Sequence, residues 1–455
     1  MPVAKAKTLF ACQGCGYQSP KWLGRCPECE AWNSLVEEVM EREAPGLRAA
    51  VAEAAPVRLR DITSFEQPRL QSGIRELDRV LGGGLVPGSV VLVGGEPGIG
   101  KSTLLLWAMS ALSAEHIPVL YVTGEESLQQ TKLRAERLGV AGEAFYVVAE
   151  TDVEVIRHLC EALKPRVMVV DSLQMLSWSA LSSSPGSVSQ VRECAALLIR
   201  AAKAGHMALV LVGHITKDGA IAGPKVVEHL VDAVLTFDGE PHSGFRILRA
   251  SKNRFGATSE IGVFQMTGRG LEEVQNPSER FLAERPQHTP GSMATATLEG
   301  SRPLLVDVEA LTTPANFGAP RRRTTGVDPQ RVDLLLAVLE QRAGLSGVAT
   351  HDVFVSASGG VRLYEPAADV AIALAIASSL TQRPTSPQDL ALGEVGLAGE
   401  MRSILGVERR LVEAQRLGFT RCVLAKQQAK SLADLRGLRV VGVASVREAL
   451  EVVQP

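Results

Sequence analysis

The sequence predicts an α/β protein in which a compact cysteine-rich module precedes a parallel-sheet core and a second α/β domain closes the chain. Four cysteines fall within the first 29 residues, and beyond Asp328 long apolar helical patterns mark a further domain. Between them, short β-rich runs alternate with helical patterns, which is typical of a mostly parallel sheet with helices on its faces. The predicted strands are 90–94, 119–123, 145–148, 167–170, 208–213, 234–237 and 245–250.

Length and composition set the limits of this prediction. At 455 residues the chain exceeds one ordinary domain, and 45% hydrophobic with 22% charged residues is the composition of a globular protein. The formal net charge of −2 gives no global attraction to nucleic acid, so a DNA-binding surface would be a local basic groove. No apolar run reaches the roughly 18 residues of a membrane span, so we expect a cytoplasmic protein without a membrane partner.

Changes in composition place the domain boundaries. The expected parts are a metal-binding module (1–36), a linker (37–56), the sheet core (57–280), an inter-domain segment (281–327) and the last domain (328–455). Several prolines and the run Arg321–Arg323 indicate the inter-domain segment, in which we expect one strand near 303–308. The arginines fit either a solvated link or a DNA contact.

The early cysteines form two CxxC pairs separated by ten residues: Cys12, Cys15, Cys26 and Cys29. Each pair can turn both thiolates toward one ion, and four thiolates make a closed tetrahedral Zn²⁺ site. Because no position is left for water, the zinc would be structural. We expect Trp22 and Trp32 to provide the apolar cover of this small site. A redox pair or free core thiols are the alternatives.

A phosphate-binding loop of the pattern GxxxxGK[ST] follows the strand at 90–94 and precedes a predicted helix at 102–114. Its residues are Gly95, Glu96, Pro97, Gly98, Ile99, Gly100, Lys101 and Ser102. In this position backbone N–H groups and the helix N-terminus can hold the phosphates of a nucleoside triphosphate, which we take to be ATP. Lys101 is expected to reach the β- and γ-phosphates, Ser102 to bind Mg²⁺, and Thr103 to lie just behind.

Three carboxylates are predicted at the carboxyl edge of the same sheet, where ligands of such folds bind. The apolar strand at 167–170 ends in Asp171, which would hold the water shell of Mg²⁺, with a helix N-cap as the alternative. The strand at 119–123 leads into Glu125 and Glu126, and one of them would polarise the attacking water. We favour Glu125, although two solvated glutamates at a helix start would give the same pattern.

The residues before and after this site indicate its class. Residues 72–85, SGIRELDRVLGGGL, resemble the beginning of a RecA/KaiC-type ATPase core, in which ATP lies between the subunits of a ring or filament. The stretch KNRFG at 252–256 and the two CxxC pairs resemble the signatures of the bacterial RadA (Sms) family. This resemblance covers essentially the whole chain.

Within that resemblance, Lys252 and Arg254 are candidate catalytic residues. They follow the strand at 245–250 at alternate positions, so both side chains can point the same way. The resemblance implies that they reach the neighbouring subunit's nucleotide or the DNA, and an arginine supplied in trans would stabilise charge on the γ-phosphate. Charged residues on an exposed strand edge are the plain alternative.

Two loops stand where RecA-like proteins carry their DNA loops. Trp178–Ser189 is rich in serine, and Lys217–Lys225 is rich in glycine with a lysine at each end. Such loops can follow a phosphate backbone with N–H groups and a few lysines. His214, just before the second loop, would sense the γ-phosphate or be an ordinary core histidine.

The carboxyl-terminal domain resembles the proteolytic domain of Lon proteases in the segments 359–369 and 396–402. Ala367 occupies the place of that family's nucleophilic serine, and Glu408 falls where its lysine should be. No lysine occurs from residue 253 to 425, so a Ser–Lys dyad cannot be built there and proteolysis is not expected. The resemblance implies a scaffold for ring assembly with basic DNA contacts at Arg321–Arg323, Arg402 or Arg409–Arg410.

The resemblance as a whole implies a RecA-like, DNA-dependent ATPase. It would be a hexameric ring motor that moves on single-stranded DNA and promotes RecA-mediated strand exchange and branch migration of recombination intermediates in double-strand break repair. ATP, Mg²⁺ and Zn²⁺ are the implied cofactors, and RecA and further copies of the chain are the implied protein partners. A replicative-type helicase, a Lon-like protease and a KaiC-like scaffold whose ATP turnover ignores DNA are the alternatives.

Overall fold

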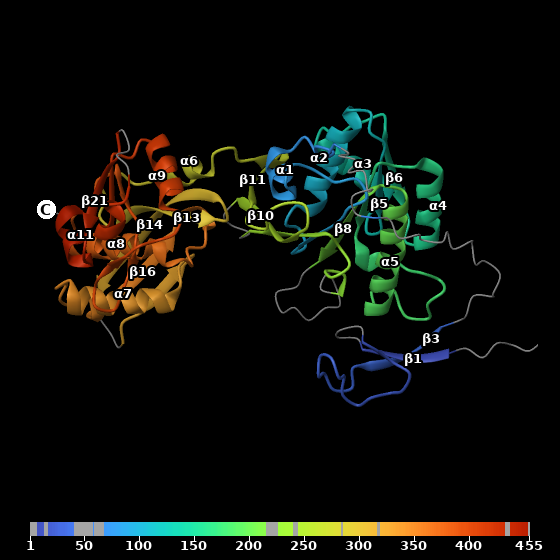
Figure 1. The fold of residues 1–455 in the computed structure, drawn as a ribbon, viewed down its shortest axis with the longest axis horizontal. Coiled ribbons are helices and arrows are strands. Elements are labelled where there is room, and N and C mark those ends of the chain that lie inside the picture. Colours follow the sequence, from blue (N-terminus) through green and yellow to red (C-terminus); the bar gives the residue numbers. More distant parts are fainter. Residues whose placement is uncertain are drawn as a thin grey trace, which may run out of the picture. The chain divides into compact units, whose positions relative to one another are not determined.

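The chain folds into two compact units (Figure 1). The computed structural model describes residues 7–12, 17–40, 58, 68–214, 226–239, 244–283, 285–315, 319–432 and 437–453. The first unit comprises Met1–Asp238, Arg246–Thr258 and Phe264–Glu273, and the second comprises Gly239–Phe245, Ser259–Val263 and Val274–Pro455. Within the described ranges no helix is both long and apolar enough to cross a membrane.

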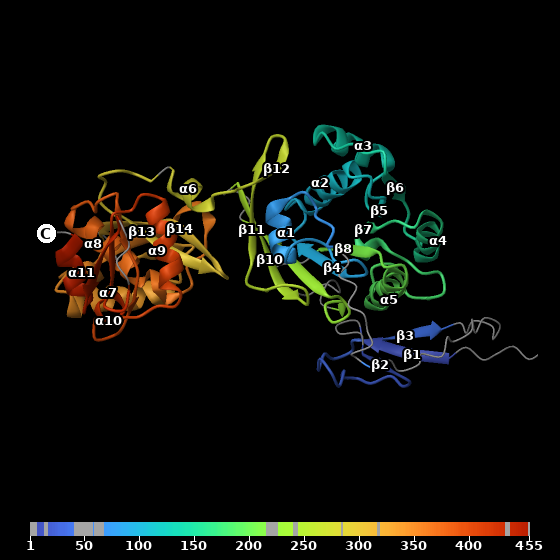
Figure 2. The ribbon, with the colours of Figure 1, turned by 45° about the horizontal axis from the view of Figure 1, so that its top comes forward.

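The amino-terminal module is an antiparallel sheet of three strands with the order β2-β1-β3 (Figure 2). They are β1 (Lys7–Cys12), β2 (Gln18–Ser19) and β3 (Leu35–Met40). Because β3 continues to Met40, the expected linker at 37–56 begins too early. Trp22 and Trp32 are 55% and 72% exposed, so the prediction that they cover the cysteines is wrong. The space around the buried thiols is filled instead by other apolar side chains, Phe10, Tyr17, Leu23 and Leu35.

The core of the first unit is a nine-stranded sheet with the order β12-β11-β10-β9-β4-β8-β7-β5-β6. Its strands are β4 (Val90–Gly95), β5 (Val119–Thr123), β6 (Phe145–Ala149), β7 (Val167–Asp171), β8 (Ala208–His214), β9 (Ala233–Asp238), β10 (Phe245–Asn253), β11 (Ile261–Thr267) and β12 (Gly270–Glu273). The pairings among β4 to β9 are parallel, and β10 joins β9 antiparallel. Every predicted strand is present, and β10 runs on beyond its expected end.

Helices cover both faces of this sheet. They are α1 (Arg75–Leu81), α2 (Lys101–Ala114), α3 (Leu128–Arg137), α4 (Val153–Leu163) and α5 (Val188–Ala204), with the short 3₁₀ turn η2 (Leu173–Met175). One apolar cluster joins α1 and α2 to one face, and a second joins α4 and α5 to the other (Figure 2). The central strands β4, β5 and β7 are buried on both faces, which explains why they read as continuous apolar runs.

The second unit contains a seven-stranded sheet with the order β15-β16-β14-β13-β17-β20-β21 and a two-stranded one of β18 and β19. The strands are β13 (Ser292–Glu299), β14 (Arg302–Pro314), β15 (Arg322–Thr325), β16 (His351–Ala357), β17 (Asp389–Ala391), β18 (Glu394–Val395), β19 (Met401–Arg402), β20 (Arg421–Ala425) and β21 (Arg439–Val443). The α-helices are α6 (Pro277–Leu282), α7 (Pro329–Arg342), α8 (Asp369–Thr381), α9 (Val407–Arg416), α10 (Lys426–Ala429) and α11 (Val446–Val453). The 3₁₀ turns are η4 (Val348–Thr350), η5 (Ser358–Gly360) and η6 (Pro366–Ala368).

The expected inter-domain segment at 281–327 is part of this second sheet. It supplies β13, β14 and β15, and β13 lies in the middle between β14 and β17. Two of the prolines that suggested a link, Pro303 and Pro314, stand near the ends of β14, where they interrupt no central ladder. The prediction of a link at 281–327 is therefore wrong, because strands rich in alanine and threonine pack here against α8 on one face and α9 on the other.

Candidate functional site

The phosphate loop forms a tight turn between β4 and α2. Gly98 and Gly100 have φ values of 76° and 116°, a region that residues with a Cβ rarely adopt. A Cβ on Gly95 would lie 2.7 Å from the carbonyl oxygen of Phe237, so a side chain would not fit there either. The glycines of the motif are thus required by the turn itself, and α2 begins at Lys101.

Lys101 points back into the loop and is buried. Its Nζ donates to the carbonyl oxygens of Gly95 at 2.8 Å and Glu96 at 2.9 Å, and it lies 3.2 Å from Nδ1 of His214. Burial lowers the pKa of Lys101, while the negative charges of Asp171 and Glu125 act in the opposite direction. The ammonium therefore lies among carbonyl and carboxylate oxygens that an anionic ligand could replace.

A cavity of about 380 Å³ opens at the carboxyl edge of the sheet beside this loop. It is lined by the loop residues Pro97, Gly98, Gly100, Lys101, Ser102 and Thr103 and by Thr123, Glu125, Glu126, Arg134, Arg137, Asp171, His214 and Met266. The remaining loop residues Gly95, Glu96 and Ile99 are not part of this lining, and Ile99 is buried in the core. The structure thus brings the predicted loop and all three predicted carboxylates together around one cavity. Arg134, Arg137 and Met266 were not expected there, because the α3 helix and the β11 strand carry no motif that marks them.

Glu125 is clamped by two side chains at the cavity edge. The Ser172 hydroxyl donates to its Oε1, and Nε2 of His214 lies 2.8 Å from the same oxygen. Because Lys101 can only donate, Nδ1 of His214 is the acceptor and Nε2 carries the proton. Burial raises the pKa of Glu125, but the hydrogen bonds from Ser172 and His214 outweigh it, so the net pKa is lowered. Glu125 is therefore an ionised carboxylate in a fixed orientation.

Glu126 has a different environment. Its carboxylate forms an ion pair with Arg134 of α3, and both side chains are 27% exposed. Its backbone N–H donates to the hydroxyl of Thr123 at 3.0 Å, which fixes the turn after β5. The two adjacent glutamates are thus separated by structure, one joined to the Lys101–His214 chain and the other to an arginine.

Asp171 ends β7 and is buried, 7% exposed. Its Oδ2 accepts a hydrogen bond from the hydroxyl of Tyr121 at 2.5 Å. The alternative of a helix N-cap does not hold, because the cap residue of η2 is Ser172 and no side chain caps that turn. Hydroxyl and carboxylate oxygens are ligands that Mg²⁺ accepts directly or through water, so the donor set of Ser102 and Asp171 fits this ion.

Lys252 and Arg254 do not reach this cavity. β10 pairs Lys252 with Val234 and Asn253 with Ala233, and these residues pair in turn with the beginning of β4. Val90 and Gly95, the first and last residues of β4, are five residues apart, so the amino ends and the carboxyl ends of the parallel strands lie about 17 Å apart. Arg254 forms an ion pair with Asp232 at 3.1 Å, and Asp232 also accepts from the N–H of Val90. Both cations therefore lie at the edge away from the phosphate loop.

The strand irregularity just before Lys252 also changes the expected arrangement, in which Lys252 and Arg254 follow β10 at alternate positions and point the same way. The β10–β9 register shifts between Ala250 and Lys252, and Lys252 donates to the carbonyl oxygen of Glu228 at 2.8 Å. The other residues of this stretch have structural contacts: the Asn253 side chain donates to the carbonyl oxygen of Val80, and a Cβ on Gly256 would lie 2.9 Å from the Cα of Gly82. The KNRFG stretch therefore packs against the glycine turn that follows α1.

The expected DNA loops are described only in part. The segment Lys217–Lys225 lies outside the described residues. The segment Trp178–Ser189 is shorter than predicted because α5 begins at Val188, and the buried Gln190 side chain fixes it by donating to the carbonyl oxygens of Trp178, Leu181 and Ser183.

Three of the four predicted zinc ligands lie together. The sulfur atoms of Cys12, Cys26 and Cys29 are within 4.8 Å of one another, and those of Cys12 and Cys29 are 3.5 Å apart. Thiolates around one zinc ion at the usual Zn–S distance would be about 3.8 Å apart, so this set fits Zn²⁺. Cys15 lies outside the described residues.

In the second unit, the segment with the Lon-like pattern contains a buried ion pair. Ala367 is 4% exposed in η6, and Glu408 is exposed on α9. Arg410 is 1% exposed and binds both oxygens of Glu365 at 2.6 Å. The expectation of a DNA contact at Arg410 is therefore wrong, because its guanidinium is in the core. Arg402 is paired with Glu394 and Glu400.

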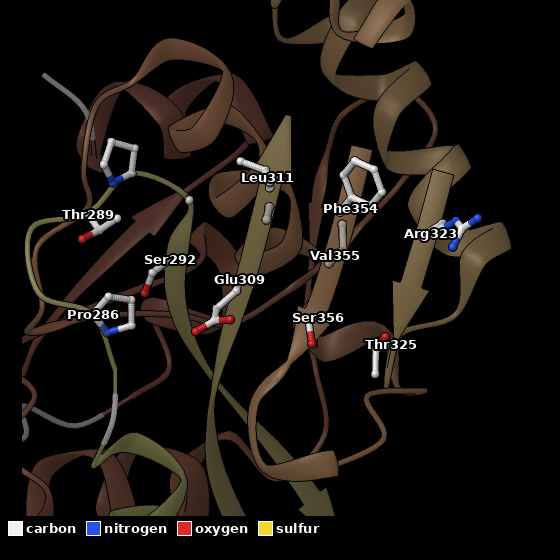
Figure 3. A pocket seen from close by; sticks show the side chains of 13 residues that line it. Pro286, Thr289, Ser292, Glu309, Leu311, Arg323, Thr325, Phe354, Val355 and Ser356 are labelled. Carbon is white, nitrogen blue, oxygen red and sulfur yellow. The ribbon is translucent and has the colours of Figure 1, made fainter. Parts of the chain in front are cut away.

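A hollow of about 520 Å³ lies over β14, β16 and β15 of this unit (Figure 3). Glu309, Ser356 and Thr325 form one row across it, and Leu311 and Phe354 form the next. At its other end the same face of the sheet, with Ala294, Ala296 and Leu305, is covered by α9. The hollow is thus the open end of a sheet face that α9 covers only in part.

Comparison with known protein families gives matches to three separate parts of the chain. Residues 10–37 match a family model described as a rubredoxin metal binding domain, 53–220 an AAA domain, and 346–454 a Lon protease (S16) C-terminal proteolytic domain. These matches confirm the predicted α/β fold class with an ATPase core between a zinc module and a Lon-like domain. The first match and the cysteine cluster indicate Zn²⁺, and the AAA match implies ATP and Mg²⁺.

Relatives match the chain over its full length. The "DNA repair protein RadA" of Bacillus subtilis (strain 168) is 49% identical over 98% of this chain and 99% of its own, and that of Streptococcus pyogenes serotype M6 is 50% identical over 99% and 100%. Among solved structures, a DnaB-like replicative helicase described with its primase interactions aligns at 14% identity and a TM-score of 0.41, over 46% of this chain and 62% of that one. Identity near one half over nearly all of both sequences confirms the resemblance to the RadA signatures: the chain belongs to the RadA family.

Proposed function

We propose that the chain is a DNA-dependent ATPase of DNA repair whose ATP sites are completed at the interfaces of a ring, and that it promotes RecA-mediated strand exchange and branch migration. One observation carries this proposal. The phosphate loop and three carboxylates surround a cavity at one edge of the sheet, while Arg254 lies at the opposite edge of the same sheet. In a head-to-tail ring the second edge of one subunit can face the first edge of the next.

The cavity residues divide the work of hydrolysis among them. The loop from Gly95 to Ser102, with Thr103, would bind the triphosphate, and Lys101 would exchange the carbonyl oxygens of Gly95 and Glu96 for phosphate oxygens. Ser102 and Asp171 would hold Mg²⁺, which supplies charge neutralisation on the phosphates when bound. Because Lys101 carries its positive charge into a site with little water, its interaction with phosphate is strong.

Glu125 is the better candidate for orienting the attacking water. It is ionised, fixed by Ser172 and His214, and joined through His214 to Lys101. A γ-phosphate that draws Lys101 away would break the contact between Lys101 and His214, so His214 can report the presence of phosphate to Glu125. Glu126, paired with Arg134, would support the turn and hold an arginine at the cavity.

Lys252 and Arg254 would act on the neighbouring subunit. An arginine supplied in trans stabilises the charge that develops on the γ-phosphate and makes hydrolysis depend on assembly. Arg254 suits this role because its side chain is 58% exposed, although Nη1 of its guanidinium is ion-paired with Asp232. The relatives are described as DNA repair proteins, and this description together with the family's loops supports single-stranded DNA and RecA as partners. The Lon-like domain would contribute to ring assembly.

The test is the steady-state ATPase rate of the full-length protein with and without single-stranded DNA, repeated in a RecA strand-exchange reaction. We expect DNA to raise the rate and the protein to extend the joints that RecA makes. Lys101→Ala is the matched inactive control and should abolish turnover. A rate indifferent to DNA would favour an ATP-gated scaffold, and unwinding of simple forks without RecA would favour a replicative-type helicase.

A further inference from the structure

The buried hydroxyl of Tyr121 contacts Asp171, which lines the nucleotide cavity, and ATP hydrolysis as proposed above gives this hydroxyl no role. Tyr121 stands in the middle of β5 and is 2% exposed. On the neighbouring strand β7, its register partner is Val169, and Asp171 pairs with Thr123 two residues further on. Residues two apart on a strand share a face, so Tyr121 and Asp171 point to the same side of the sheet. This is the side that α2 covers.

The phenol contacts one of the residues expected to hold magnesium. Its hydroxyl donates to Oδ2 of Asp171 at 2.5 Å. Because a carboxylate oxygen can only accept, the phenol is the donor of this hydrogen bond. The hydroxyl therefore fixes one oxygen of the Asp171 carboxylate.

We infer that Tyr121 is a positioning residue for Mg²⁺ bound with ATP, an inference that rests on the proposed ATPase function. With Oδ2 held by the phenol, the Asp171 carboxylate cannot rotate freely, and Oδ1 is left for the water shell of the ion. A ligand that is already oriented loses less freedom when the ion binds. Without the phenol, Oδ2 would be a buried acceptor lacking this donor, since Asp171 is 7% exposed.

A purely structural tyrosine would behave differently. The ring of Tyr121 packs in the core with Val119 and Val169, and phenylalanine would fill the same space. If the ring alone mattered, Tyr121→Phe would leave nucleotide binding unchanged. If the hydroxyl orients Asp171, the same substitution weakens the magnesium-dependent part of binding only.

The experiment measures binding of a fluorescent ATP analogue to the full-length protein over a Mg²⁺ titration and again in EDTA. For Tyr121→Phe we expect the half-saturating Mg²⁺ concentration to rise about 10-fold or more, the usual effect of losing a residue that orients a metal ligand. Affinity in EDTA should change by less than about twofold, because the phosphate loop is intact. Tyr146→Phe, on the adjacent strand β6 with 45% exposure, is the matched control and should match wild type.

A half-saturating Mg²⁺ concentration within about twofold of wild type for Tyr121→Phe would overturn the inference. A double-mutant cycle with Asp171→Asn tests the route: if Tyr121 acts through Asp171, adding Tyr121→Phe to Asp171→Asn has no further effect, whereas additive losses overturn it. If Tyr121→Phe alone fails to fold, Asp171→Asn can still be compared with the double variant, because the neutral amide that replaces the carboxylate of Asp171 leaves no buried charge. If the wild-type protein binds the analogue no more tightly with Mg²⁺ than in EDTA, the proposed ATPase function itself is contradicted, and not only the role of Tyr121.

Discussion

Replacing Arg410 with methionine would remove one partner of a buried ion pair in the second unit. Arg410 is 1% exposed and contacts both carboxylate oxygens of Glu365 at 2.6 Å, and it also donates to the carbonyl oxygen of Ala296. Methionine has a similar length and no charge, so the cavity term is small and the loss is mainly electrostatic. The change therefore isolates what this guanidinium contributes to folding.

The magnitude follows from what would be left behind. Breaking a buried ion pair by removing one partner costs about 3–5 kcal/mol. Glu365 is 29% exposed and keeps the N–H of Leu298 as a donor, so the lower end, about 3 kcal/mol, applies. For a unit of this size each kcal/mol lowers the melting temperature by about 2–4 °C, which gives a shift of about 6–12 °C.

The loss should depend on pH. Burial raises the pKa of Glu365, but the hydrogen bonds and charge of Arg410 outweigh it, so the folded pKa lies below the ordinary value of 4.5. A lowered carboxylate pKa gives stability that is present above the unfolded value and is lost as pH falls through the folded one. The difference in free energy of unfolding between wild type and Arg410→Met should therefore be largest near neutral pH and shrink below 4.5.

The assay is thermal unfolding of the full-length chain, followed by calorimetry at neutral and acid pH. Arg409→Met is the matched control, because Arg409 is the preceding residue on the same helix and is exposed. We expect it to shift the melting temperature by less than about 2 °C. Equal shifts for the two variants, or a difference that grows as the pH falls, would refute the assignment of Arg410 to the core.

Three further predictions concern the proposed site. Glu125→Gln should lower the DNA-stimulated ATPase rate by about 100-fold or more, and Glu126→Gln should lower it by less than about 10-fold. Equal losses for the two variants in a steady-state assay would contradict the choice of Glu125. Cys12→Ser should release zinc, and metal analysis that finds less than about half an equivalent in the intact protein would count against the zinc site. Arg254→Ala should keep ATP binding but lose turnover. Mixing it with Lys101→Ala subunits should restore activity at interfaces where an intact phosphate loop of one subunit meets an intact Arg254 of the next. If mixing restores no activity, the result argues against action in trans.

The sequence predicts the local elements of the first unit well because their signals are local. The central strands β4, β5 and β7 are buried on both faces, so each reads as an unbroken apolar run. The strand expected near 303–308 is present as part of β14, but the same reasoning missed β13 and β15, because their alanine, threonine and arginine residues give no such run. It also placed Trp22 and Trp32 in the cover of the cysteines, since the size of a side chain does not say on which side of a small sheet it lies.

What the sequence by itself determined is the chemistry available: the loop that ends in Lys101 and Ser102, the carboxylates Glu125 and Asp171, and four early thiols. These depend on short spacings along the chain, which fix backbone turns and neighbouring ligands. Only the tertiary structure decided how the groups are paired. It joined Tyr121 to Asp171, separated Glu125 from Glu126, and put Arg254 at the far edge of the sheet. Such pairings arise when strands distant in sequence become neighbours, and no spacing along the chain records them.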